Sequence, residues 1–206
     1  MHRWFEWFGL ECKFVLTVLL SLLALGMALV FRTPARWLMA AAMLCSSLGD
    51  LILANWRGLG SRMPIPSFYA GMLCFIAAHI LYAAAFAGLV RRQGASVFNP
   101  GGRLALLLAA AVGTAVVIAA LRRPGVDLRL LAACTGYLCI IGWMLMNVFA
   151  LAWSAKGVHI LTALGAFSFF LSDVIIGLDT LVHITAYSRY IWWLYPIGQL
   201  LMLLFA

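Results

Sequence analysis

The sequence HILTALGAFSFFLSDVII (His159–Ile176) holds one formally charged residue, Asp173, among 18 residues. A helix rises 1.5 Å per residue, so about 20 apolar residues are needed to cross roughly 30 Å of hydrocarbon. The run is therefore typical of a transmembrane helix. An aspartate inside such a helix costs roughly 2.5 to 3.5 kcal/mol, so we expect Asp173 to face other helices or a cavity and to have a function.

Apolar runs of this kind fill the chain. Of its 206 residues, 66% are hydrophobic and 10% are charged, and the mean hydropathy is +1.08, whereas apolar residues make up about half of a soluble domain. We predict an all-α integral membrane protein, with a single domain over residues 1–206 and a bundle of seven or eight transmembrane helices. The seven runs are Phe14–Phe31, Trp37–Asn55, Phe68–Val90, Leu104–Leu121, Leu130–Leu151, His159–Ile176 and Ala186–Phe205.

The basic residues lie mostly in the short links between these runs. The 14 lysines and arginines outnumber six acidic residues, giving a net charge of +8. Positive charge beside membrane helices sets topology and contacts headgroups, so we do not expect nucleic-acid binding. The basic residues slightly favour a cytoplasmic N-terminus. The five cysteines form no CxxC pair and are interpreted as small apolar side chains without disulfides.

A second aspartate, Asp50, lies in the apolar run CSSLGDLIL (Cys45–Leu53). The second and sixth runs cross in the same direction, and each carries its aspartate near its C-terminal end. We therefore expect Asp50 and Asp173 at similar depth, facing each other or a shared cavity. Further polar residues are predicted in the same half of the bundle: Lys13 at its rim, and His79, Tyr195 and Gln199 deeper.

Two stripes of residues at four-residue spacing could line this site. One consists of Gly71, Phe75, His79 and then Tyr82, and the other of Gly165, Phe169 and Asp173. Ordinary helix packing also explains the glycines and phenylalanines, and structural hydrogen bonds remain an alternative for His79, Tyr195 and Gln199. Ser46, Ser47 and Ser172 are expected to be hydrogen-bond partners of the aspartates. Only His79 is a deep histidine, so we predict no metal or other cofactor.

Four segments resemble the YhhN family, which includes the mammalian lysoplasmalogenases. In the family's order they are SSLGDLIL around Asp50, GMLCFIAAHILY around His79, GAFSFFLSD around Asp173, and YPIGQLLM near the C-terminus. Family members have eight helices, and their lysine is usually followed by proline, whereas Lys13 precedes Phe14. This difference leaves the helix count and the orientation of the N-terminus open.

The resemblance implies hydrolysis of the vinyl ether bond of a lysoplasmalogen, releasing a fatty aldehyde and a glycerophospho-alcohol. Two carboxyl groups suffice for this reaction, as in glycoside cleavage, where one gives a proton and the other activates water. We expect Asp173 to be the acid because its neighbours are more apolar than those of Asp50. Lys13, Arg57 and Arg62 could hold the lipid phosphate.

Other functions fit the same residues. Intramembrane aspartate and histidine also form proton relays, so a proton-coupled lipid transporter or flippase is an alternative. A hydrolase of another lysolipid and a structural lipid-binding protein are further alternatives. We expect the protein in a bacterial inner membrane, with membrane lipids and a lysophospholipid substrate as its partners.

Overall fold

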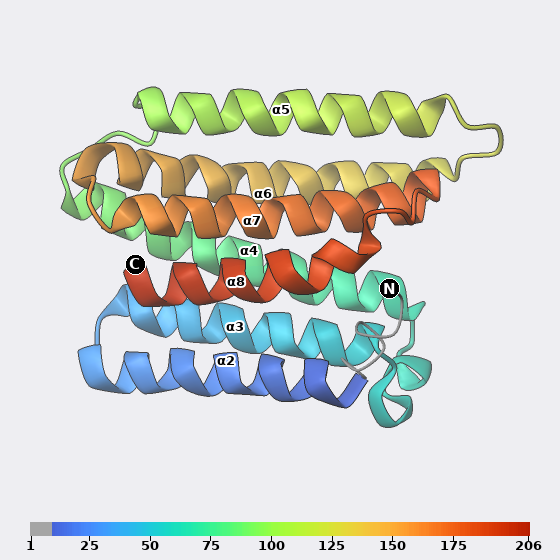
Figure 1. The fold of residues 1–206 in the computed structure, drawn as a ribbon, viewed down its shortest axis with the longest axis horizontal. Coiled ribbons are helices and arrows are strands. Elements are labelled where there is room, and N and C mark those ends of the chain that lie inside the picture. Colours follow the sequence, from blue (N-terminus) through green and yellow to red (C-terminus); the bar gives the residue numbers. More distant parts are fainter. Residues whose placement is uncertain (1–9) are drawn as a thin grey trace. The chain divides into compact units, whose positions relative to one another are not determined.

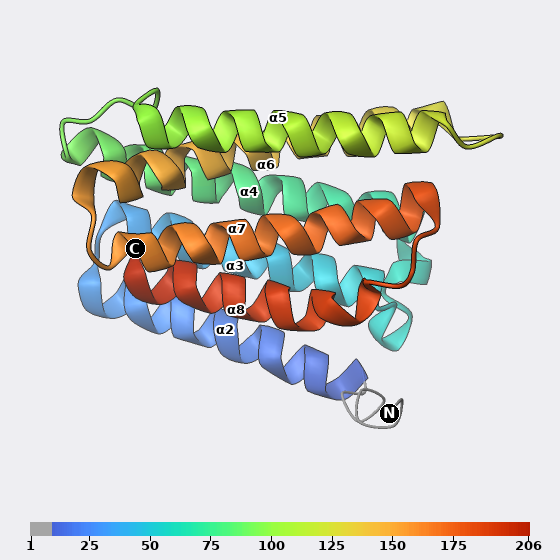
Figure 2. The same cartoon turned by 45° about the horizontal axis from the view of Figure 1, so that its top comes forward.

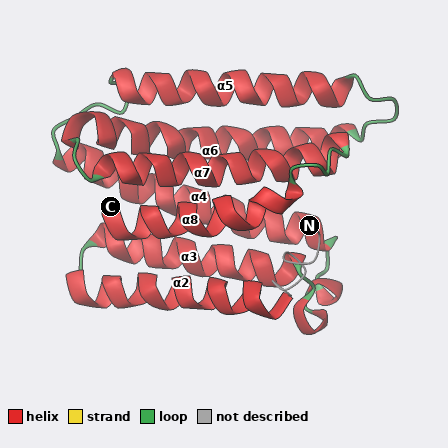
Figure 3. Cartoon of the chain, viewed as in Figure 1, coloured by secondary structure: helices red, strands yellow, loops and turns green. Residues whose placement is uncertain are grey.

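A computed structural model describes the backbone of residues 10–206 and the side chains from Val15 onward. Within this part of the chain all regular elements are helices, joined by short loops (Figure 3). The chain divides into two compact units, the first ending at Ala85 and the second comprising Phe86–Ala206. The described residues form seven α-helices, in agreement with the seven predicted runs: α2 (Leu10–Phe31), α3 (Pro34–Leu53), α4 (Ser67–Arg92), α5 (Pro100–Leu121), α6 (Leu128–Ala155), α7 (His159–Gly177) and α8 (Ile191–Phe205) (Figure 1).

In the first unit, α2 and α3 form an antiparallel hairpin and lie side by side (Figure 1), and Figure 2 shows the short connection at one end of the pair. The connection is only two residues long. Arg32 adopts a left-handed conformation, and Thr33 caps α3 by accepting a hydrogen bond from the backbone N–H of Arg36. Pro34 follows the cap, where a missing N–H is tolerated. These local signals place α3 directly back along α2.

Glycines let α3 and the first part of α4 approach closely. A Cβ atom on Gly49 would lie 2.8 Å from Cε2 of Phe75 and 3.2 Å from the carbonyl oxygen of Gly71. A Cβ on Gly71 would in turn lie 2.6 Å from Cγ of Leu53. Larger side chains at either glycine would separate the helices, as is usual for small residues between membrane helices. This contact, made by the residue next to Asp50, fixes the position of α3 along α4.

The second unit is built from α5 to α8, with α5 against α6, α6 against α7, and α7 against α8. Asn99 connects two of these helices. Its Oδ1 accepts a hydrogen bond from the N–H of Gly102 and so caps α5, while its Nδ2 donates to the carbonyl of Ala150 in α6 at 2.9 Å. Gly165 and Gly198 make the closest contact of α7 with α8, since a Cβ on Gly198 would lie 2.7 Å from the carbonyl oxygen of Gly165.

The predicted boundaries of the last two runs differ from the structure. The segment after Ile176, predicted to be a link, continues α7 as a π-helical turn over Leu178–Val182. The final α-helix begins at Ile191 and not at Ala186, after a short 3₁₀ turn at Ser188–Tyr190. Among the residues that the structure describes, five helical segments are long and apolar enough to cross a membrane: Pro34–Leu53, Ser67–Arg92, Pro100–Leu121, Leu128–Ala155 and His159–Val182.

Candidate active site

Asp50 is held in the first unit by a hydroxyl group from α2. The hydroxyl of Thr17 donates a hydrogen bond to Oδ2 of Asp50 at 3.0 Å. One turn away, the hydroxyls of Ser21 and Ser47 lie 2.6 Å apart, and Ser47 donates to the carbonyl of Thr17 at 3.2 Å. Thr17 and Ser21 are buried, whereas Asp50 is half-buried. A row of hydroxyl groups therefore runs along the α2–α3 interface and ends at the carboxylate.

Thr17 was not among the residues selected from the sequence. A threonine in a run of leucines and valines is a weak signal, because its hydroxyl can bond to its own helix backbone. Ser47 was expected to bond to Asp50, and the structure shows it bonded to Thr17 and Ser21. Ser46 is fully buried on α3.

His79 and Tyr82 are both fully buried on α4. Nδ1 of His79 lies 2.7 Å from the carbonyl oxygen of Phe75, to which it donates. The hydroxyl of Tyr82 donates to Sδ of Met43 at 3.8 Å.

The α3–α4 contacts fix the level of His79 within the first unit. Gly49 lies opposite Phe75, and Met43 lies opposite Tyr82. His79 is one turn beyond Phe75, so it lies at the level of Ser46, about 6 Å along the helix axis from the level of Asp50. The structure therefore places Ser46 and His79 at one depth, and Asp50 one turn nearer the end of α3.

Asp173 lies in the second unit and is 7% exposed. The phenolic hydroxyl of Tyr137 in α6 donates a hydrogen bond to its Oδ2 at 3.1 Å. Ser172, expected as a partner of the aspartate, instead donates to the carbonyl of Phe169 in its own helix at 2.7 Å. Sequence analysis missed Tyr137, although a tyrosine inside the uncharged run Leu130–Leu151 is the signal that could have identified it.

Tyr195 and Gln199 lie at different distances from Asp173 along α7. The ring of Tyr195 packs edge-on against Phe169, with centroids 5.2 Å apart, and so lies about one turn below Asp173. Gln199 is fully buried beside Gly198, which faces Gly165. Gly165 precedes Asp173 by eight residues, which is about 12 Å along the axis. The structure thus places Tyr195 within one turn of Asp173 and Gln199 about two turns away.

The basic residues expected at the rim are only partly described. Lys13 belongs to α2, but its side chain lies outside the described residues. Arg57 follows Asp50 in a 3₁₀ turn, has a left-handed backbone, and places its guanidinium 4.6 Å from the ring centroid of Trp56. Arg62 ends the next 3₁₀ turn. Arginine over an aromatic ring is common where a membrane protein meets headgroups.

Asp50 belongs to the first unit and Asp173 to the second, and each is described within its own unit. Their predicted meeting at one site stays a prediction. Among residues 10–206, no three histidine, cysteine, aspartate or glutamate side chains are grouped as metal ligands would be. The four cysteines with described side chains, Cys45, Cys74, Cys134 and Cys139, are free thiols.

Comparison with known proteins relates these features to a family. A lysoplasmalogenase from Bos taurus, TMEM86A, is 27% identical over 182 residues, which cover 87% of this chain and 69% of that protein. No solved structure matches the chain. The YhhN family profile matches residues 10–205 and so includes Asp50, His79, Asp173 and Tyr195. The chain is a member of the YhhN family.

Proposed function

We propose that this protein hydrolyses the vinyl ether bond of a lysoplasmalogen, releasing a fatty aldehyde and a glycerophospho-alcohol. The similarity to a protein named lysoplasmalogenase supports this substrate. The observation that carries the chemistry is the buried carboxyl group of Asp173, which lies in a helix apolar enough to cross a membrane. It accepts a hydrogen bond from the hydroxyl of Tyr137 in the neighbouring helix. A buried carboxyl group is a suitable proton donor in an apolar site, and the bond from Tyr137 would orient it.

The proposed reaction begins with transfer of a proton from a carboxyl group to the alkenyl carbon farther from the ether oxygen. The carbon beside the oxygen becomes part of an oxocarbenium ion. Water, deprotonated by a carboxylate, adds to that carbon and gives a hemiacetal. Collapse of the hemiacetal releases the aldehyde, and the hemiacetal hydroxyl proton passes to the glycerol oxygen. The proton that the base took from water then returns to the acid, so one water is consumed and both carboxyl groups regain their starting states.

We assign the acid to Asp173 and the base to Asp50. Asp173 is buried and Asp50 is half-buried, and the less exposed of two carboxyl groups is the better candidate for the protonated partner. The hydroxyls of Tyr137 and Thr17 donate to Oδ2 of Asp173 and of Asp50, respectively, and would fix the orientation of the two carboxyl groups. The acid and base assignment is that of paired-carboxylate hydrolases.

The remaining predicted residues are proposed as substrate contacts. His79 and Ser46, which share one level, would contact the polar part of the lipid near Asp50. Tyr82 and Tyr195 would contact the alkenyl chain of the lipid, and Gln199 would lie farther from the membrane face. Lys13 and Arg57 would attract the phosphate of the substrate at the membrane face as the lipid enters. We place the protein in a bacterial inner membrane and propose that it needs no metal or other cofactor.

The test is an aldehyde assay with the purified protein and a lysoplasmalogen. Wild-type protein should release aldehyde, and Asp50→Asn and Asp173→Asn should each reduce the rate by a factor of about 10² or more. Asp179→Asn is the matched control, because Asp179 lies in the π turn and accepts a hydrogen bond from Ser188. Full activity in either of the first two variants would refute the two-aspartate mechanism. In D₂O the aldehyde should carry one deuterium at carbon 2.

The alternative is a proton-coupled lipid transporter, and the aspartates and His79 inside membrane helices favour it. Wild-type protein that released no aldehyde but moved a labelled lysolipid across proteoliposomes would support transport. Testing hydrolysis of alkyl-ether and ester lysolipids as well identifies a third possibility. Faster hydrolysis of one of these lipids would indicate a hydrolase that prefers another lysolipid. Inhibition by a chelator would contradict the proposed lack of a metal.

A further inference from the structure

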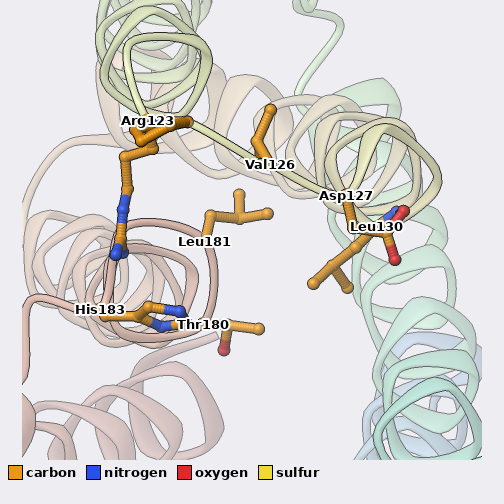
Figure 4. A pocket seen from close by; sticks show the side chains of 9 residues that line it. Arg123, Val126, Asp127, Leu130, Thr180, Leu181 and His183 are labelled. Atoms are coloured by element: carbon orange, nitrogen blue, oxygen red, sulfur yellow. The ribbon is translucent and has the colours of Figure 1, made fainter.

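A pocket of about 190 Å³ opens in the second unit where α6 begins and the π turn follows α7 (Figure 4). The link between α5 and α6 forms one wall and the π turn the other. The lining residues are Arg123, Pro124, Gly125, Val126, Asp127, Leu130, Thr180, Leu181 and His183. At about 30 Å³ per water molecule, this volume accommodates a small polar group.

Each wall of the pocket contains a residue with a left-handed backbone conformation. Gly125 has a φ of 76°, in the left-handed region that favours glycine, and turns the chain between α5 and α6. On the other wall the backbone widens into the π turn and ends at His183, which has a φ of 53°. Single π turns within helices often occur at functional sites.

The charged groups of the pocket lie on opposite sides. Arg123 extends toward His183, whereas the carboxylate of Asp127 lies on the far side of the pocket beside Leu130 (Figure 4). Nη1 of Arg123 is buried and has no hydrogen-bond partner. Oδ1 of Asp127 accepts hydrogen bonds from the backbone N–H groups of Arg129 and Leu130. A buried donor without a partner is costly, and a bound oxyanion would satisfy it.

The pocket is aligned with the Tyr137–Asp173 pair. Leu130, in the pocket wall, precedes Tyr137 by seven residues on α6, and Thr180 follows Asp173 by seven residues along α7 and its π turn. Seven helical residues correspond to about 10 Å along the axis. The hydrogen-bonded pair therefore lies about 10 Å deeper than the pocket on both helices. An extended lysoplasmalogen spans a separation of this order only when it is counted from the phosphate, through the glycerol, to the alkenyl carbon that the acid protonates.

We propose that this pocket binds the zwitterionic headgroup of the lysophospholipid, with the phosphate at Arg123 and His183 and the ammonium group toward Asp127. The inference rests on the proposed function and names the headgroup site for it. The planar guanidinium of Arg123 can donate two hydrogen bonds to phosphate oxygens. On the opposite wall, the negative charge of Asp127 can pair with an ammonium group. A phosphate without an ammonium group would leave Asp127 facing a second anion.

The test measures binding rather than turnover, so that it is independent of hydrolysis. An alkyl-ether lysophosphoethanolamine, which lacks the vinyl ether, is titrated into purified full-length protein in detergent. Three comparison ligands are used: the corresponding alkylglycerol phosphate, the uncharged alkylglycerol, and inorganic phosphate. Arg123→Gln should weaken binding of both phosphate-containing lipids about tenfold or more and leave the alkylglycerol unchanged.

Two variants make the test specific. Arg122→Gln is the matched control, since Arg122 is the exposed neighbour outside the pocket, and it should bind every ligand as wild type does. Asp127→Asn keeps a good helix cap and should weaken only the lipid that carries the ammonium group. Equal effects of Arg123→Gln and Arg122→Gln would overturn the proposal. An effect of Arg123→Gln on inorganic phosphate alone would identify a free-anion site and also overturn it.

Catalysis provides a separate readout. With a lysoplasmalogen as substrate, Arg123→Gln should raise KM and leave kcat nearly unchanged, because the headgroup is distant from the reacting carbon. A wild-type protein that binds the lysolipid through Arg123 but releases no aldehyde would retain the headgroup site and refute only the proposed hydrolysis. A fall in kcat with unchanged KM would contradict the headgroup assignment.

Discussion

Tyr137 of α6 donates its phenolic hydrogen to Oδ2 of Asp173 of α7 across 3.1 Å. Asp173 is almost fully buried, so this bond replaces water as a partner of the carboxyl group. The bond also fixes the orientation of the carboxyl group relative to α6. Tyr137 is therefore expected to position the acid and not to react itself.

We expect Tyr137→Phe to lower kcat about ten- to a hundredfold and to leave KM nearly unchanged, because a hydrogen bond to a charged or reacting group is worth about 1.5–3 kcal/mol. Steady-state kinetics on lysoplasmalogen measures both parameters. Tyr187→Phe is the control, since Tyr187 is exposed in the loop before α8. A rise in KM alone would show that Tyr137 binds substrate and does not orient Asp173.

The Thr17 hydroxyl is expected to have the equivalent role for Asp50. Thr17→Val removes the donor and keeps the shape, so we expect a rate about tenfold lower. Thr17→Ser retains the donor and should recover most of the activity. If the Thr17→Val and Thr17→Ser variants were equally active, the hydrogen bond from Thr17 to Asp50 would have no part in the reaction.

The two aspartates are expected to act as a unit. The double variant Asp50→Asn/Asp173→Asn should be about as slow as the slower single variant, because removing one member of an acid–base pair already abolishes the coupled step. Rates of the four proteins in the double-mutant cycle test this directly. If the rate reduction in the double variant equalled the product of the two single reductions, the carboxyl groups would act independently.

Gly198 is expected to determine how closely α8 packs on α7. A Cβ at this position would lie 2.7 Å from the Gly165 carbonyl oxygen and 2.8 Å from the Phe169 amide nitrogen, so backbone must move. We expect Gly198→Ala to destabilise the protein by about 1–3 kcal/mol, seen as a lower Tm in detergent. Gly177→Ala is the control, because nothing lies within 4 Å of a Cβ there, and its Tm should match that of wild type or exceed it.

Much of the fold was predictable because the lengths of apolar runs and the capping residues are local properties. Thr33 with Pro34 and Asn99 with Pro100 mark the starts of α3 and α5, which were predicted three and four residues too late, at Trp37 and Leu104. The start of α8 was predicted five residues too early. Ala186 and Tyr187 are compatible with a helix by type, but the chain there forms a loop and a 3₁₀ turn, with Ser188 bonded to Asp179.

The partners of the candidate site residues were less predictable. Asp50 and Asp173 could be selected from the sequence because a carboxylate in an apolar run is costly wherever the helix packs. Their hydroxyl partners, Thr17 and Tyr137, could not, because each pairing depends on the rotation of one helix against another. Glycine contacts such as Gly49 with Phe75 set the approach of such helices.

Hydropathy and charge are properties of single residues, so the amino-acid sequence is enough to identify a set of membrane helices that carry two aspartates. The bond from Tyr137 to Asp173 and the pocket shared by Arg123 and His183 are seen only in the folded chain. These residues are far apart in the sequence. Their contacts arise from close packing between helices, which no local pattern of residues encodes.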